Sequence, residues 1–253
     1  MASKETILQT KELSKDFGAL IAVNRVNLDV GVGVHSIIGP NGAGKTTLFN
    51  LLTGFLKPSR GEVFYQGRKI TGLQPYRISQ MGMARSFQIT SIFPELTVYE
   101  NVRIAVQSRV KARYNFLTSF EKLKGVHEKT QSVLKQVGLN KLTDVKAKNL
   151  SYGDKRILEI GLSLAGNPKV LLLDEPTSGV GGHERGGVAR FIHDLTRKWT
   201  VLLVEHDMDI VMGISDRIVV MQQGRIIADG APEEIKNNET VKEVYLGGKY
   251  CLA

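Results

Sequence analysis

The stretch GPNGAGKT, residues 39–46, decides the fold of this 253-residue chain. It matches the pattern G-x-x-x-x-G-K-[S/T], follows an apolar, strand-like segment at residues 34–38 and leads into an apolar helical pattern at residues 47–52. Glycines let the backbone of such a loop turn its N–H groups inward, toward phosphate oxygens. The N-terminus of the following helix adds partial positive charge. The sequence therefore predicts a strand, a phosphate-binding loop and a helix in succession.

Two side chains of the loop have the chemistry that a nucleoside triphosphate requires. We expect Lys45 to reach the β and γ phosphates and the Thr46 hydroxyl to ligate Mg²⁺. A chance match to the pattern, a glycine-rich turn without a ligand, is expected on the order of once in a hundred chains of this length at average residue usage. The neighbouring strand and helix make it rarer still. The predicted contacts with the nucleotide come from Gly39, Pro40, Asn41, Gly42, Ala43, Gly44, Lys45, Thr46 and Thr47.

A pair of carboxylates follows the apolar segment KVLLLDE, residues 169–175. Ligands of open α/β sheets gather at the carboxyl ends of the strands, where Asp174 and Glu175 would lie. We expect Asp174 to hold Mg²⁺ through its water shell and Glu175 to accept a proton from the attacking water. A lone Asp–Glu pair at a strand end is also a common solvated loop feature. Together with a phosphate loop, however, the pair favours hydrolysis of the triphosphate.

The composition narrows the class of protein. A single cysteine, Cys251, excludes a disulfide scaffold and indicates a reducing compartment. The N-terminal residues show no secretory signal, and no apolar run is long enough to span a bilayer. The net charge of +9 admits a nucleic acid, an anionic lipid surface or a phosphate ligand as partner. Much of this charge lies in residues 103–156, which form either a solvated basic face or a docking surface.

The order of predicted elements gives the fold class. Short β-rich segments come first, helical patterns occupy residues 97–110 and 121–139, and strands and helices then alternate from residue 169 onward. Such alternation is typical of a mostly parallel sheet with helices on both faces. We predict an α/β, P-loop NTPase core with a small antiparallel β subdomain and an inserted α-helical lobe. The expected divisions are residues 1–90, 91–160 and 161–253, and the last ends in a late hairpin at 224–230 and a helical tail at 232–247.

The segment LSYGDKR, residues 150–156, is read locally as a helix start. Ser151 can cap the helix, Asp154 follows three residues later, and apolar residues continue at helical spacing. A cap requires neither Tyr152 nor Gly153, so this pair needs another explanation.

That explanation comes from a resemblance to the ATP-binding subunits of ABC transporters, which covers nearly the whole chain. LSYGD stands in place of that family's signature, which is commonly LSGGQ. ARSFQ resembles its Q-loop at Gln88, VLLVEHD its switch histidine at His206, and SKDFGA has Phe17 where an aromatic ring stacks on adenine. The resemblance identifies the nucleotide as ATP.

The resemblance implies how the site is assembled. Two subunits pair head to tail, as a homodimer or as a heterodimer with a second ATPase subunit. Ser151 and Gly153 of one then contact the γ-phosphate bound by the other. Gln88 is expected to bind Mg²⁺ and water, and His206 to contact the γ-phosphate. The implied catalytic set is Glu175, His206, Lys45 and Gln88, and the implied metal set is Thr46, Gln88 and Asp174. Gly153 allows the backbone to approach the phosphate closely. The N-terminus of the helix that Ser151 caps also points at the anion, so capping and phosphate binding by Ser151 are compatible.

Two departures from the family pattern bear on hydrolysis. Asp154 stands where Gln is usual, and its carboxylate would repel the γ-phosphate unless it turns into the helix cap. After EPTSG, Val180 and Gly181 replace the common Leu and Asp or Asn, which removes a polar side chain that couples the two sites. We expect nucleotide binding to survive both changes. A weakly hydrolysing subunit that depends on a catalytic partner therefore remains an alternative.

Within the family the chain is most similar to the ATPases of branched-chain amino acid importers, through LSYG and the tail VKEVYLG, residues 241–247. The resemblance implies integral membrane permease subunits as partners, docked near residues 88–100, and indirectly a periplasmic or surface substrate-binding protein. The chain would lie peripherally on the cytoplasmic face of the membrane. Urea or short amides are alternative substrates. An ABC-type ATPase acting on nucleic acid or ribosomes is the alternative class, but the short lobe and single cassette disfavour it, so no nucleic acid is expected.

Overall fold

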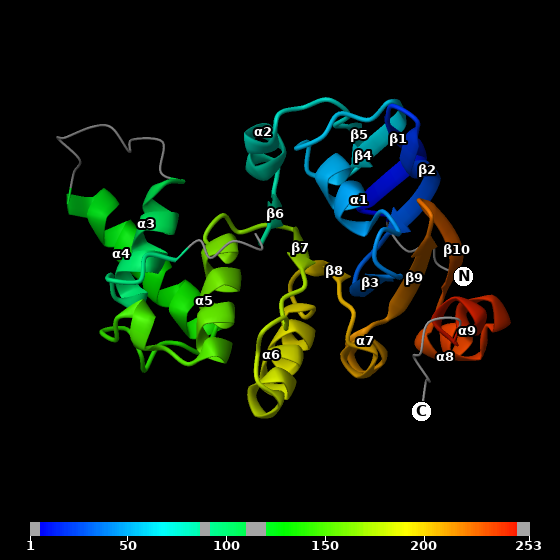
Figure 1. Ribbon diagram of the computed structural model, residues 1–253. Helices are drawn as coiled ribbons and strands as arrows, with labels where there is room; N and C mark the ends of the chain where they lie inside the picture. Colours follow the sequence, from blue (N-terminus) through cyan, green and yellow to red (C-terminus); the bar gives the residue numbers. More distant parts are fainter. Residues whose placement is uncertain (1–5, 87–91, 110–119, 247–253) are drawn as a thin grey trace.

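The computed structural model describes residues 6–86, 92–109 and 120–246, which form two sheets, a helical lobe and several covering helices (Figure 1). The larger sheet has six strands in the order β10-β9-β3-β8-β7-β6. These strands are β3 (Val34–Ile38), β6 (Met83–Arg85), β7 (Val170–Asp174), β8 (Thr200–Val204), β9 (Arg217–Gln222) and β10 (Arg225–Gly230).

The larger sheet is parallel except at one edge, where β10 pairs antiparallel with β9. Its strands are apolar runs because both faces are covered: alternate residues of β7 belong to two different hydrophobic clusters. In the strand register, Val204 pairs with both Ile37 and Asp174. The carboxyl ends of β3, β7 and β8 therefore lie at one edge of the sheet, where the phosphate loop and Asp174 emerge.

The smaller sheet is antiparallel, in the order β2-β1-β4-β5. Its strands are β1 (Leu8–Phe17), β2 (Leu20–Val30), β4 (Arg60–Tyr65) and β5 (Arg68–Lys69). Helix α1 (Lys45–Leu52) lies between the two sheets and packs Leu48, Phe49 and Leu52 into their common cluster. The helix that follows the phosphate loop is thus held on both sides, which fixes the loop at its N-terminus.

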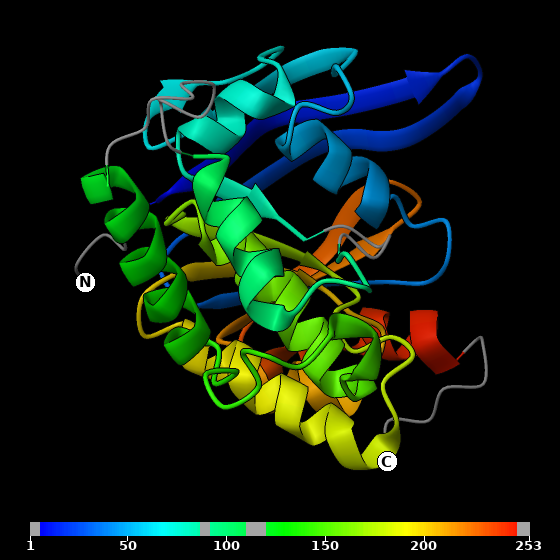
Figure 2. The same cartoon turned by 90° about the vertical axis from the view of Figure 1, so that its left-hand side faces the viewer.

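The helical lobe projects from the β6 and β7 edge of the larger sheet, and Figure 2 looks onto it. It contains α3 (Val98–Gln107), α4 (Phe120–Gln136), a 3₁₀ turn η1 (Ala147–Asn149) and α5 (Tyr152–Leu164). Helix α3 begins with a complete capping box between Thr97 and Glu100. The lobe and the sheet share one hydrophobic cluster, so the signature helix α5 is packed firmly against the core.

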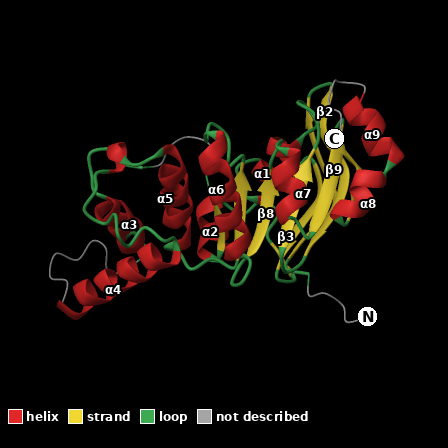
Figure 3. Cartoon of the chain, turned by 90° about the horizontal axis from the view of Figure 1, so that it is seen from below, coloured by secondary structure: helices red, strands yellow, loops and turns green. Residues whose placement is uncertain are grey.

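The remaining helices cover the faces and ends of the larger sheet (Figure 3). They are α2 (Pro75–Gln80), α6 (Gly182–Leu195), α7 (Met208–Ile214), α8 (Pro232–Asn237) and α9 (Glu239–Leu246). The expected late hairpin is formed by β9 and β10. The helical tail is interrupted: Asn238 is extended, and its side chain accepts a hydrogen bond from the Val241 N–H at 3.1 Å, so a second helix begins there.

The predicted fold class is confirmed by this architecture: a mostly parallel sheet, a small antiparallel sheet and an inserted helical lobe. The proposed divisions at residues 90 and 160 stay predictions, and helix α5 runs through the second of them. Among the described residues, no helix is both long and apolar enough to cross a bilayer.

Candidate active site

The phosphate loop joins β3 to α1, and two of its glycines leave no room for a side chain. Gly39 and Gly44 have φ angles of 150° and 101°, in the left-handed region that side chains avoid. A Cβ atom at Gly39 would collide with the Met221 carbonyl oxygen, and one at Gly44 with the Ala22 carbonyl oxygen. The loop therefore packs closely against neighbouring backbone, directly before the N-terminus of α1.

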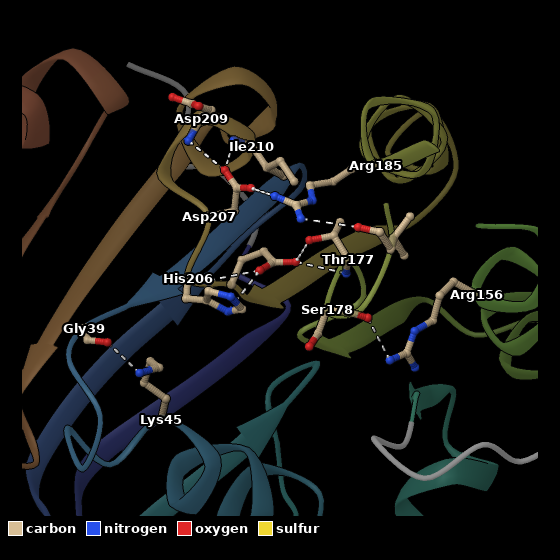
Figure 4. A network of polar contacts seen from close by, with 12 residues as sticks. Gly39, Lys45, Arg156, Thr177, Ser178, Arg185, His206, Asp207, Asp209 and Ile210 are labelled. Atoms are coloured by element: carbon tan, nitrogen blue, oxygen red, sulfur yellow. Dashed lines mark hydrogen bonds and ion pairs between the residues drawn. The ribbon is translucent and has the colours of Figure 1, made fainter. Parts of the chain in front are cut away.

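Lys45 opens α1 and folds back over the loop (Figure 4). Its Nζ donates hydrogen bonds to the carbonyl oxygens of Gly39 at 2.6 Å and Pro40 at 3.1 Å. Burial lowers the pKa of the Lys45 ammonium, and the charges of Glu175 and Asp174 oppose this shift. The structure thus brings together the three charged groups that the sequence predicts for phosphate, metal and water.

Asp174, at the end of β7, is held by a residue that the motifs do not reveal. Arg85 of β6 donates to Asp174 Oδ2 at 2.8 Å and to Asn50 Oδ1 of α1 at 2.6 Å. The guanidinium also lies 5.7 Å from the ring centroid of Phe49. The side chains of Arg85 and Asp174 are 11% and 1% exposed, so this is a buried ion pair. The only sequence signal was a basic residue inside the ARSFQ segment.

Glu175 follows directly and adopts a φ angle of 48°, unusual for a residue with a side chain. Its N–H donates to the Val204 carbonyl at 2.8 Å, which ties the residue to the end of β8. A second buried acid, Glu205, directly follows β8. It accepts hydrogen bonds from the Thr177 N–H at 3.0 Å and from the Thr177 hydroxyl. Glu205 was not predicted, although it directly follows the buried strand β8.

His206 lies beside this network of polar contacts (Figure 4). Its side chain is 64% exposed, and Nδ1 lies 3.6 Å from Oε2 of Glu205. The next residue, Asp207, caps α7 and accepts a hydrogen bond from Arg185 of α6 at 2.8 Å. The switch segment is thereby linked to the segment that follows β7.

The signature residues lie at the N-terminus of α5. Ser151 is the N-cap, and its Oγ accepts a hydrogen bond from the Asp154 N–H at 3.1 Å. The Asp154 carboxylate turns into this cap and accepts from the Ser151 hydroxyl at 3.1 Å. The Gly153 N–H donates to Oε2 of Glu184 at 3.0 Å, a contact that the sequence did not predict.

Tyr152 has a contact of its own with the segment after Glu175. A Cβ atom on Gly179, which has a φ of 76°, would lie 3.1 Å from the Tyr152 ring. Arg156 lies over the same ring, with 6.0 Å between its Cζ atom and the ring centroid, and donates to the Ser178 carbonyl at 3.2 Å. Tyr152 and Gly179 thus hold the signature and the segment after Glu175 together within one subunit.

Two predicted residues lie apart from these groups. Phe17 ends β1 with its side chain 48% exposed, available for stacking, and Lys15 Nζ is 5.1 Å from its ring centroid. Gln88 lies outside the described residues, so its predicted role stays a prediction.

The described side chains form two groups. Lys45, Asp174, Glu175 and His206 follow strands of the larger sheet, whereas Ser151 and Gly153 belong to the helical lobe and contact Asp154 and Glu184. A phosphate loop at a strand end with an adjacent Asp–Glu pair defines a P-loop nucleoside triphosphatase. The serine-glycine helix start in an inserted lobe defines the ATP-binding-cassette class within it. The ABC transporter family model matches residues 23–178, and the chain belongs to that family.

Similar proteins support the assignment along nearly the whole chain. The chain is 41% identical to the high-affinity branched-chain amino acid transport ATP-binding protein LivG of Escherichia coli, over 96% of this chain and 98% of that protein. It is also 41% identical to BraF of Pseudomonas aeruginosa, over 95% and 98% of the two chains. A second model, described as branched-chain amino acid ATP-binding cassette transporter, matches residues 225–250.

Solved structures give the same fold. The ADP conformation of MJ1267, an ATP-binding cassette of an ABC transporter, superposes with a TM-score of 0.85 at 33% identity, covering 96% of this chain and 99% of that one. The dimeric post-hydrolysis state of the cassette MJ0796, bound to ADP and Pi, superposes with a TM-score of 0.72 at 25% identity, covering 89% and 99%.

Proposed function

We propose that this chain is the ATP-binding and hydrolysing subunit of a membrane ABC importer for branched-chain or other hydrophobic amino acids. The observation that carries the ATPase assignment is the convergence of Lys45, Asp174 and Glu175 at one edge of the sheet. The amino-acid assignment rests on the similarity to LivG and BraF over nearly the whole chain.

The residues present fit a Mg²⁺ ion bound with the nucleotide. Oδ1 of Asp174 is buried and has no hydrogen-bond partner among the described residues, while Oδ2 is committed to Arg85. A buried oxygen of this kind suits a water of the Mg²⁺ shell, and Thr46 follows Lys45 where a hydroxyl ligand is expected. Bound Mg²⁺ neutralises charge on the β and γ phosphates. Gln88 completes the proposed set.

Each remaining residue has one proposed role in hydrolysis. Lys45 leaves its loop carbonyls to bind the β and γ phosphates, Glu175 accepts a proton from the attacking water, and His206 contacts the γ-phosphate. The exposed imidazole beside a buried carboxylate supports the role of His206, because Glu205 orients the segment that presents it. Phe17 stacks on adenine.

The complete site is proposed to form between two subunits, as a homodimer or with a second ATPase subunit. Within one chain, Ser151 and Gly153 contact carboxylates of their own subunit, and the family resemblance is what assigns them to a phosphate bound by a second subunit. The dimeric state of the MJ0796 cassette supports this arrangement for a protein of the same fold.

The permease is proposed to dock near residues 88–100 and in the groove between the core and the helical lobe. This hollow has a volume of about 370 Å³ and is lined by α2, β6 and α5. Tyr76 and Phe55 at its rim are 57% and 50% exposed, and Arg109 lies beside them. Exposed aromatic rings with a flanking cation are typical of a surface that meets another protein. Docked in this way, the chain would lie peripherally on the cytoplasmic face of the membrane.

The test is transport itself. Cells that produce the permease and the substrate-binding protein should take up labelled leucine with the wild-type chain but not with Glu175→Gln. That variant should bind ATP yet lose hydrolysis by at least about 100-fold. Uptake of urea or a short amide without leucine would replace the substrate assignment. Association with ribosomes or DNA, and none with membranes that contain the permease, would contradict the transport role.

A weakly hydrolysing subunit with a catalytic partner is the second candidate. The segment Val180, Gly181 and Gly182 favours it, because Gly181 has no side chain where the family pattern has a polar one that couples the two sites. In a mixed dimer, Glu175→Gln in this chain alone would then leave most of the hydrolysis intact.

A further inference from the structure

The Gly153 N–H, which is assigned to the γ-phosphate of a partner-bound nucleotide, is already engaged within its own chain. Its acceptor is Oε2 of Glu184, 3.0 Å away on the first turn of α6. The two residues are packed together, because a Cβ atom on Gly153 would lie 3.3 Å from the Glu184 side chain. A carboxylate oxygen therefore occupies the direction in which this N–H points.

The second signature donor is engaged in the same way. The Ser151 hydroxyl donates to Oδ2 of Asp154 at 3.1 Å. Both groups assigned to the γ-phosphate thus face carboxylates of their own subunit. The two contacts differ in their separation along the sequence. Asp154 belongs to the same helical turn as Ser151, whereas Glu184 belongs to a separate helix, 31 residues after Gly153.

We propose that Glu184 is an internal stand-in for the γ-phosphate and must leave Gly153 before the signature can bind a nucleotide on the partner subunit. This inference rests on the proposed function, because it requires a signature that works across an interface. One N–H makes one well-aligned hydrogen bond, so Glu184 and a phosphate oxygen compete for it. Both groups are negatively charged, and their repulsion adds to the competition. Glu184 is a positioning residue that sets the ATP concentration at which two subunits close.

The structure allows Glu184 to move without disturbing the helix that carries it. The next residue, Arg185, anchors the first turn of α6 through Asp207 at 2.8 Å and the Val180 carbonyl at 3.3 Å. The space around Gly181 and Gly182, at the start of α6, is open, since a Cβ atom on either glycine would meet nothing within 4 Å. Rotation of the partly exposed Glu184 side chain is therefore enough to free Gly153.

The test uses the full-length Glu175→Gln chain, in which bound ATP persists, and measures dimer formation by light scattering as ATP is added at constant Mg²⁺. Glu184→Ala should lower the ATP concentration for half-maximal dimer by about tenfold, because a hydrogen bond to a charged acceptor need not be broken. Glu184→Gln, which has nearly the same shape and keeps a neutral acceptor, should give a smaller decrease. Asp194→Asn removes one charge from the same helix without touching Gly153 and should change nothing.

A second measurement examines the contact without nucleotide. Amide hydrogen exchange in the segment containing Gly153 should be faster in Glu184→Ala than in the parent chain. Unchanged exchange would show that the contact is absent in solution and would overturn the proposal.

The outcomes separate this proposal from the proposed function. A parent chain that dimerises with ATP, together with Glu184 variants that need as much ATP or more, would overturn the role of Glu184 alone. A parent chain that binds ATP but stays monomeric would contradict the homodimer. Amide exchange at Gly153 would then decide the role of Glu184: faster exchange in Glu184→Ala supports it, and unchanged exchange overturns it.

Discussion

At the scale of single residues, Gly181 is one of the positions where this chain departs from the family pattern. It is the N-cap of α6, with φ −61° and ψ 150°, a conformation that any residue can adopt, and a side chain there would meet open space. We expect Gly181→Asp to raise ATP hydrolysis in the assembled complex by about two- to tenfold, if the added group makes one hydrogen bond that couples the sites. Steady-state hydrolysis per complex measures this.

The same substitution should also cap α6 and raise the free energy of unfolding by a few tenths of a kcal/mol. Gly182→Asp is the matched control, since it places a carboxylate one residue later, inside the helix. Equal or lower turnover in Gly181→Asp than in the wild type would count against the coupling argument.

Arg85 gives a prediction about stability. Removing it would leave the Asp174 carboxylate buried without a counter-ion, and breaking a buried pair typically costs about 3–5 kcal/mol. We expect Arg85→Met to lower the free energy of unfolding by that amount in a urea titration. The control is Arg109→Met, a change at another arginine of the same groove. Its guanidinium donates a hydrogen bond to the Ser79 hydroxyl, and its loss should cost about 1 kcal/mol or less. Equal losses in the two variants would refute the assignment.

His35 should make the fold sensitive to acid. Burial in β3 lowers the pKa of its imidazole, the charge of Arg217 lowers it further, and Asp216 opposes the shift. A histidine with a lowered pKa in the folded state takes up its proton more readily when unfolded. The free energy of unfolding should therefore fall as the pH drops below about 6.5, by at most about 1.4 kcal/mol per pH unit.

His35→Leu should remove this contribution to the pH dependence between pH 7 and 5, as measured by urea unfolding at each pH. His193→Leu, a change at an exposed histidine of α6, is the control and should leave the slope as it is in the wild type. The explanation fails if the slope persists in His35→Leu.

At the scale of elements, the local motifs predicted which residues stand at the strand ends, but not which distant residues contact them. Lys45 and Asp174 could be assigned because each stands at a fixed position after an apolar strand. The partners Arg85 and Glu184 could not, because they are 89 and 31 residues from the groups they bind, and no local pattern requires them. Helix α6 ends at Leu195, where the Thr196 hydroxyl donates a hydrogen bond to the His193 carbonyl at 2.6 Å.

The basic lobe gives the prediction at this scale. Charge reversal at Arg109, Lys111 and Arg113 should weaken binding to membranes that contain the permease, because these cations would face acidic loops or anionic lipid. Arg109 lies at the groove, with its guanidinium donating to Ser79 Oγ at 2.9 Å, while the other two lie outside the described residues. Flotation of the chain with permease-containing vesicles measures the effect, and binding of the wild type should also weaken at high salt.

Reversal of three exposed cations outside the lobe, Arg68, Arg190 and Lys236, is the matched control for net charge. If both triple variants bind equally well, the basic lobe is only a solvated face.

At the scale of the whole molecule, the α/β core and its inserted lobe could be predicted because the spacing of apolar residues indicates the order of strands and helices. The assembled site could not be predicted in the same way. Ser151 and Gly153 are satisfied within the subunit by capping and by Glu184, so one chain gives no geometric sign of what they bind across an interface. Only a second subunit can complete the arrangement proposed for them.

The most direct test of the central claim is therefore the size of purified Glu175→Gln, measured by light scattering with and without ATP and Mg²⁺. We predict a monomer without nucleotide and a stable dimer with ATP and Mg²⁺, because the ATP that joins the two subunits is no longer hydrolysed. The double variant Lys45→Ala, Glu175→Gln should stay monomeric. A Glu175→Gln chain that binds ATP but remains a monomer under every condition would contradict closure between two copies of this subunit.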